Sequence, residues 1–169
     1  TNDVFPSAGK LTALELMIPL AQQLHALQNA LAHKAEEFAD VVKIGRTQLQ
    51  DAVPETMGQT FSVFAHMIAR DAKRRELCVL NLGGTAIGTG INTTEVYRAR
   101  IVPILSQLTG YPLHTAEDLM DATQNLDGFV AVSGALKTCA VDLSKMCNDL
   151  RLLSSGPRAG LGELQLPAM

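Results

Sequence analysis

Apolar residues between positions 129 and 153 recur at alternating spacings of three and four without a break. They are Phe129, Val132, Leu136, Cys139, Leu143, Met146, Leu150 and Leu153. This spacing places a single apolar seam along a helix, as in coiled coils. Small residues beside the seam, among them Gly134 and Ala135, let other helices approach closely. A helix of about 25 residues is roughly 37 Å long, which is more than a compact domain of this size needs. We therefore predict an elongated helical bundle that gains burial by association.

Three further segments also have helical patterns. Leucines keep to one face of residues 4–38, but Pro19 cannot donate a backbone hydrogen bond, so this segment should form two helices or one kinked helix. Two more helices are predicted over residues 55–81 and 93–108. The expected caps of the latter are Thr93 or Thr94 at its start and Gly110 at its end. The chain has no Trp and only five Phe, so its core must consist mainly of aliphatic residues, which favours helix packing. The expected fold class is all-α.

Length and charge exclude several kinds of protein. The 169 residues suffice for one domain with a sizeable core, and we expect residues 1–169 to form a single helical-bundle domain. The net charge of -3 offers no basic face for nucleic acid. Lysines and arginines are scattered except in Lys73-Arg74-Arg75, which should be a solvated helix face. No stretch approaches the roughly 18 apolar residues of a membrane span.

The cysteines and the chain start bear on the compartment. Cys78, Cys139 and Cys147 lack framework spacing and lie in apolar helical patterns, so we expect three buried thiols in a reducing compartment. No basic-then-apolar signal pattern opens the sequence, and we expect a cytoplasmic protein. The chain begins at Thr1 in the middle of a motif, which indicates a fragment.

Three polar stretches interrupt the helical patterns at positions 1–3, 45–54 and 82–92. The middle one carries a guanidinium, a hydroxyl, two amides and a carboxylate, so it is either a ligand site or a loop that caps the flanking helices. The first is an N-cap or a set of ligand donors. The third is a glycine-rich structural turn or an active-site wall, and it lacks the G-x-G-x-x-G pattern of dinucleotide binding.

Metal and nucleophile patterns are weak. His25 and His33 would lie two helical turns apart, about 12 Å along the axis, which is too far for one metal ion. We predict neither a metal site nor a cofactor. Ser154-Ser155 before Gly156-Pro157 is better explained as a closed helix end than as a nucleophile turn.

Four motifs together resemble the aspartase/fumarase superfamily over the whole chain. They are TND at positions 1–3, GRTQLQDAVP at 45–54, LGGTAIGTGIN at 82–92 and LRLLSSGPRAGL at 150–161. The resemblance implies the central helical-bundle domain of that fold, roughly the middle third of a family member. It also implies a homotetramer whose active sites are each assembled from three subunits, with L-aspartate and fumarate as the partners.

Within the superfamily the chain is closer to the aspartases, which eliminate ammonia from L-aspartate to give fumarate. Fumarases typically have His where this chain has Gln48 and Trp where it has Leu152. Residues 160–164, in contrast, are more similar to the fumarase pattern. Two alternatives therefore stay open: a class II fumarate hydratase and a non-catalytic helical scaffold of the same superfamily.

The resemblance also assigns roles to side chains. Thr1 would bind the carboxylate next to the carbon that loses its proton, and Asn2 would lie near the amine. Thr47 would bind the other carboxylate and Gln48 would lie beside the leaving group. Arg46 would neutralise a substrate carboxylate or form a structural ion pair. No catalytic residue is expected inside the chain, because the family's general-base serine would lie beyond Met169, and the fragment alone should be inactive.

Overall fold

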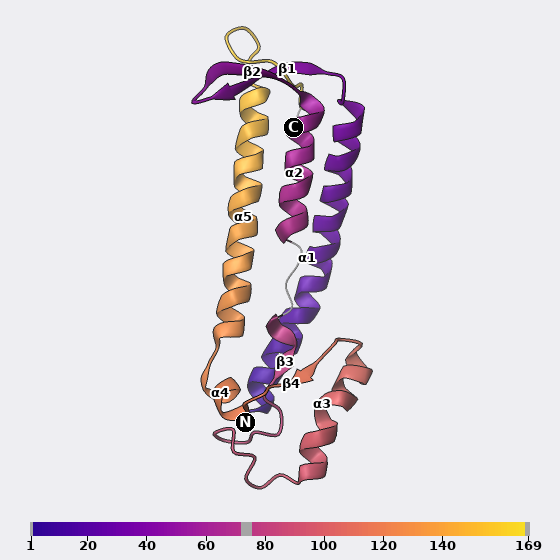
Figure 1. Cartoon of the computed structure of the whole chain (residues 1–169), viewed down its shortest axis with the longest axis vertical. Helices are drawn as coiled ribbons and strands as arrows, with labels where there is room; N and C mark the ends of the chain where they lie inside the picture. Colours follow the sequence, from indigo (N-terminus) through magenta and orange to yellow (C-terminus); the bar gives the residue numbers. More distant parts are fainter. Residues whose placement is uncertain (1, 72–75, 168–169) are drawn as a thin grey trace. The chain divides into compact units, whose positions relative to one another are not determined.

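The computed structural model describes residues 2–71 and 76–167. Contacts between residues divide the chain into two compact units. Unit 1 comprises residues 1–20 and 74–135, and unit 2 comprises residues 21–73 and 136–169. The elements in chain order are α1 Val4–Glu37, β1 Val42–Thr47, β2 Gln50–Thr56, α2 Met57–Asp71, η1 Glu76–Cys78, β3 Val79–Leu80, α3 Glu95–Thr109, β4 His114–Thr115, α4 Leu119–Gln124 and α5 Asp127–Leu153 (Figure 1). The predicted all-α class is confirmed, since helices dominate and the strands are few and short.

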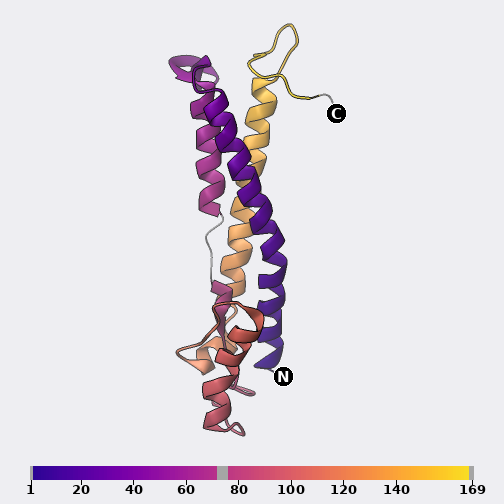
Figure 2. The same cartoon turned by 90° about the vertical axis from the view of Figure 1, so that its right-hand side faces the viewer.

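Unit 2 is a bundle of three helices. The second half of α1, all of α2 and the second half of α5 lie side by side in both views (Figures 1 and 2). They share one core, which consists of Leu24 and Leu31 of α1, Met57, Phe61, Phe64, Ala65, Met67 and Ile68 of α2, and Cys139, Met146 and Leu153 of α5. Leu143 and Leu150 pack against that core. From Cys139 onward the apolar seam of α5 thus packs into the core, as its spacing predicts, whereas Leu136 is 42% exposed.

The polar stretch at residues 45–54 belongs to a β-hairpin and not to a loop that caps the flanking helices, and its role as a ligand site stays a prediction. β1 and β2 pair antiparallel, with an irregularity between Ile44 and Arg46. The two-residue turn between them consists of Gln48 and Leu49, with φ of 51° and 63°. Favoured two-residue hairpin turns need positive φ, which Gly, Asn and Asp supply most readily. Neither turn residue is one of these, which is why the sequence carried no hairpin signal.

Unit 1 contains the start of α1, the short parallel pair β3 and β4, α3, α4 and the start of α5. Its core consists of Cys78, Leu80, Leu82, Val102 and Leu113. The third predicted helix is confirmed as α3. Thr94 accepts a hydrogen bond from the backbone of Tyr97, and Gly110, with φ of 74°, closes the helix by bonding Ser106 O. The short helix α4, capped by Asp118, was not predicted.

Other expectations need correction. Residues 4–37 form one helix that continues through Pro19, so the two-helix alternative is wrong. The helix predicted over 55–81 is confirmed over residues 57–71 as α2, but its last part is wrong. α2 ends at Asp71, and from Glu76 the chain turns through η1 into β3, where Leu80 pairs with Thr115. Tertiary pairing overrides the helical pattern there. The basic run at 73–75 lies outside the described residues.

The burial of the cysteines and of α5 is only partly as expected. Cys78 and Cys139 are buried, whereas Cys147 on α5 is exposed, so the expectation that all three thiols are buried is wrong. Val130 and Val141 are also exposed, at 69% and 58%. Within the chain α5 therefore covers one stripe, and burial of its other faces by association stays a prediction. Of the helices in the described ranges, none has the combined length and apolar character of a membrane span.

Candidate functional site

The hairpin of unit 2 carries two of the predicted binding residues. Thr47 is the last residue of β1 and pairs with Gln50, and Gln48 is the first residue of the turn. Both side chains are exposed. A non-glycine residue with positive φ carries strain, of order 1 to 3 kcal/mol, and such positions cluster at functional sites. The hairpin thus presents a hydroxyl and an amide to solvent on a constrained turn.

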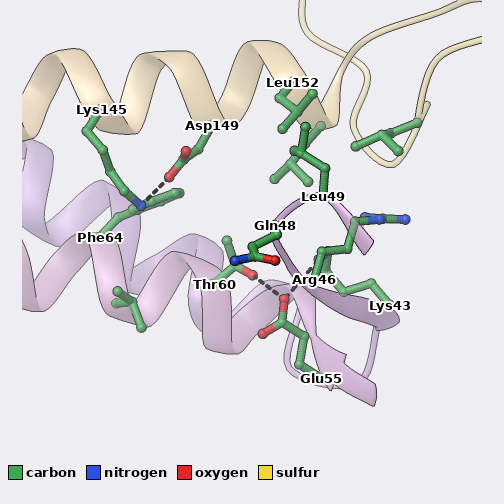
Figure 3. Close-up of a pocket in the computed structure, with 13 residues that line it drawn as sticks. Lys43, Arg46, Gln48, Leu49, Glu55, Thr60, Phe64, Lys145, Asp149 and Leu152 are labelled. Carbon is green, nitrogen blue, oxygen red and sulfur yellow. Dashed lines mark hydrogen bonds and ion pairs between the residues drawn. The ribbon is translucent and has the colours of Figure 1, made fainter. Parts of the chain in front are cut away.

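A cavity of about 480 Å³ opens beside this hairpin, between it and the adjoining helices of unit 2. Its residues come from the hairpin, α2, α5 and the segment after α5 (Figure 3). They are Lys43, Arg46, Gln48, Leu49, Glu55, Thr60, Val63, Phe64, Lys145, Asp149, Leu152, Leu153 and Leu161. Gln48 lines the cavity, whereas Thr47 is not among these residues. Its lining includes cations and carboxylates, and Lys145 is paired with Asp149 on α5.

Arg46 is held by carboxylates of the chain itself. Its Nη1 lies 2.6 Å from Glu163 Oε1, and its Nε lies 3.3 Å from Asp51 Oδ1. The hydrogen bond to Glu163 is the main reason that the pKa of Arg46 is raised above its ordinary value. Of the two roles open to Arg46, this geometry supports the structural ion pair. Contact between Arg46 and a substrate carboxylate stays a prediction.

Lys43 lies on the same strand and is the most buried cation of the hairpin, with 7% of its side chain exposed. Its Nζ lies 2.9 Å from Glu55 Oε1 and 3.4 Å from Glu163 Oε2. A buried charge is tolerated only where opposite charges and hydrogen bonds compensate it. Lys43 and Glu163 were not singled out from the sequence, because the fold brings Glu163 to this strand from far along the chain, as its bond to Arg46 across 117 positions shows.

Unit 1 brings together two other polar stretches, the start of the chain and the glycine-rich segment. Asn2 Nδ2 donates to Ala86 O at 2.7 Å. The Asp3 carboxylate accepts from the backbone N–H groups of Val4, Gly83 and Thr85, at 2.8, 3.3 and 3.3 Å. Asp3 therefore caps α1 and ties the glycine-rich segment to it, as expected for a cap or supporting residue. Thr1 lies outside the described residues.

Asn81 joins these stretches from a fully buried position. Its Nδ2 donates to Asn2 O at 3.2 Å and to Thr123 Oγ1 at 3.0 Å, and its Oδ1 accepts from Ser7 Oγ at 3.3 Å. Sequence reasoning missed Asn81, because its partners are tens of residues away along the chain. A buried side chain bonded in this way fixes the backbone of Asn2.

The glycine-rich segment has a structural reason for its glycines. A Cβ on Gly88, whose φ is 92°, would lie 2.3 Å from Met120 Cα, and one on Gly90 would lie 2.3 Å from Arg98 Nη1. Close backbone packing against α4 thus accounts for Gly88. The structural-turn interpretation is supported, and the neighbouring Ala86–Asn2 bond leaves the active-site wall open as a prediction.

The turn after α5 is a closed helix end, as predicted. α5 ends at Leu153, and Ser155 Oγ donates to Leu152 O at 2.6 Å while accepting from Leu161 N at 3.0 Å. Ser155 O also accepts from Gly162 N at 2.8 Å. Ser155 thus holds the following loop back on the helix end rather than acting as an exposed nucleophile.

The predicted binding residues fall into two groups. Thr47 and Gln48 are neighbours on the hairpin of unit 2, and Asn2 belongs to unit 1. The role assigned to each of them stays a prediction.

Comparisons with known proteins agree with the four motifs. The family described as Lyase matches residues 1–169. The chain is 53% identical to aspartate ammonia-lyase from Helicobacter pylori, over 100% of this chain and 37% of that protein. A solved structure of fumarate lyase:delta crystallin from Brucella melitensis bound to cobalt is 50% identical, with a TM-score of 0.91 over 99% of this chain and 37% of that one. Class II fumarase from Schistosoma mansoni is 34% identical, with a TM-score of 0.87 over 94% and 38%. The chain spans little more than a third of the length of these proteins.

Proposed function

Because the chain belongs to the Lyase family, we propose that the protein of which it forms part is an aspartate ammonia-lyase, which reversibly eliminates ammonia from L-aspartate to give fumarate. The observation that carries the proposal is 53% identity, over the whole chain, to a protein of that name. Gln48 and Leu152 agree with it, since fumarases typically have His and Trp at these positions, although residues 160–164 are more similar to the fumarase pattern.

The reaction needs donors aimed at a dicarboxylate. Removal of the Cβ proton puts a second negative charge on the neighbouring carboxylate, so preorganised hydroxyl, amide and cationic groups lower the barrier by stabilising that charge. In this proposal Thr1 binds that carboxylate and Thr47 binds the other. Asn2 and Gln48 lie near the amine that leaves. The exposed hairpin turn supports the roles of Thr47 and Gln48, because a residue that binds a ligand must reach solvent.

The general base is a serine outside this chain. None of the residues in the four motifs is proposed to take the proton, and no cofactor or metal is required. The homotetramer supplies the remaining groups, with each active site shared between subunits. Exposed apolar side chains on α5, such as Val141, support such an assembly. The cytoplasm is the proposed compartment, because the cysteine spacing is not that of a disulfide framework.

A class II fumarate hydratase is the second candidate, favoured by the match to the fumarase of Schistosoma mansoni. The test is to purify the complete protein that carries this sequence and to follow fumarate by its absorbance with L-aspartate and with L-malate. Turnover of aspartate well above that of malate is expected. Preference for malate would support the fumarate hydratase instead, and turnover of neither would support the non-catalytic scaffold.

A further inference from the structure

Glu163 is fixed by its backbone to the end of α5. Its N–H donates to Leu153 O at 2.8 Å, and the N–H of Leu164 donates to the same oxygen at 3.2 Å. Leu153 is the last residue of α5 and belongs to the core of unit 2. The position of Glu163 is therefore set by the helix bundle and does not depend on its side-chain contacts.

The carboxylate of Glu163 reaches from this anchor to the hairpin. Oε1 accepts from Arg46 Nη1 at 2.6 Å, and Oε2 lies 3.4 Å from Lys43 Nζ. Only 16% of the Glu163 side chain is exposed. Lys43 in turn pairs with Glu55 on β2. One carboxylate thus joins β1 directly to the segment that follows α5, and β2 indirectly through Lys43 and Glu55.

The other described bonds between the hairpin and the helices lie toward its base, where Thr60 Oγ1 of α2 donates to Glu55 Oε1 at 3.4 Å. A two-stranded hairpin is marginally stable by itself. Residues 50–53 of β2 are exposed, and the turn residues Gln48 and Leu49 hold positive φ. At its other end the hairpin is tied by a backbone bond from Met57 N to Val41 O. The ion pair between Glu163 and Arg46 is made close to the turn, since Arg46 directly precedes Thr47, whereas Lys43 lies nearer the open end of the hairpin.

We propose that Glu163 is a positioning residue, which holds the hairpin so that Thr47 and Gln48 meet the substrate in a productive geometry. The carboxylate of Glu163 is paired with Lys43 and Arg46 and is mostly buried, so we place its action on these two side chains and not on the substrate. The inference rests on the proposed function, since it assumes that Thr47 and Gln48 bind the substrate.

The test uses the complete protein with Glu163→Gln, which keeps the size of the side chain and removes its charge. The matched control is Glu37→Gln, because Glu37 is paired with Lys34 at 2.6 Å on the exposed face of α1 in the same unit. Hydrogen exchange is measured at residues 42–56 and at residues 61–68 of α2. Steady-state kinetics with aspartate and the melting temperature are measured on the same preparations.

Glu163→Gln should speed exchange in the hairpin several-fold while leaving that of α2 unchanged, because only the local opening becomes easier. It should lower kcat/KM roughly ten- to a hundredfold, the size of loss that a shift of about 1 Å in a reacting group produces. Glu163→Asp keeps the charge and should recover part of that loss. Glu37→Gln should change neither measurement.

Three results would overturn the inference. Unchanged exchange at residues 42–56 would show that Glu163 does not hold the hairpin. Exchange that rises equally in α2, with a lower melting temperature, would show a general stabilising role. Faster hairpin exchange with unchanged kcat/KM in an active enzyme would show that the anchor has no catalytic consequence. If the unmodified protein did not turn over aspartate, the proposed function would fail, and hydrogen exchange would still decide whether Glu163 anchors the hairpin.

Discussion

Thr47→Ala in the complete protein tests the proposed role of the hairpin most directly. Thr47 ends β1 and is exposed, so the substitution removes a hydroxyl without opening a cavity. A hydrogen bond to a charged group contributes about 1.5 to 3 kcal/mol. Since about 1.36 kcal/mol corresponds to tenfold in rate, kcat/KM for aspartate should fall roughly ten- to a hundredfold.

The effect of Thr47→Ala on stability should be small. The structure excludes a helix cap for Thr47, because it lies in a strand and pairs with Gln50. The whole scale of strand propensities spans only about 1 kcal/mol, and an exposed position uses part of it. The melting temperature should therefore stay nearly unchanged.

Thr56→Ala provides the matched control on the same hairpin. Thr56 Oγ1 accepts from Gln59 N at 3.1 Å, and Gln59 Oε1 accepts from Thr56 N at 2.9 Å, which is a capping box at the start of α2. Its loss should cost about 1 kcal/mol of stability and leave the kinetics unaltered. The assay is fumarate absorbance with aspartate as the substrate, together with thermal melting of both variants. Unchanged kcat/KM in Thr47→Ala would refute the binding role.

Three further outcomes are expected. This chain by itself should show no aspartate turnover, because binding groups without a base cannot remove a Cβ proton, and fumarate formation that tracks the purified chain would contradict this. Light scattering should find the chain self-associated. Val141→Asp, at an exposed position, should reduce the assembly while circular dichroism still shows a helical protein, whereas Leu143→Asp puts a charge against the core and should unfold the chain. A stable monomer of the unmodified chain would exclude the association. Burial lowers the pKa of Lys10 below its ordinary value of 10.5, and the charge of Asp127 opposes this shift, so the unfolded state binds more protons than the folded state. The stability of the wild type relative to Lys10→Met should therefore rise as the pH increases toward 10.5. A constant difference between the urea midpoints of the two proteins across that range would show that burial does not perturb Lys10.

The sequence by itself determined the elements whose signals are local. The seam of α5 is a spacing of three and four, and the limits of α3 follow from Thr94 and Gly110, which act on backbone groups one turn away. The closed end of α5 at Ser155 is of the same kind. The candidate binding residues Thr47 and Gln48 could also be named from the sequence, because they belong to a contiguous motif.

Only the tertiary structure decided what those residues are attached to. The hairpin was missed because Gln48 and Leu49 carry no turn signal, and the helix predicted through Leu80 gave way to a strand paired with Thr115. Likewise Arg46 meets Glu163 across 117 positions of the sequence. Helical periodicity and capping depend on neighbours within a turn or two along the chain. A buried charge is stabilised by whichever partner the folded chain brings within a few ångströms. Because that partner can lie anywhere in the sequence, no local pattern predicts it.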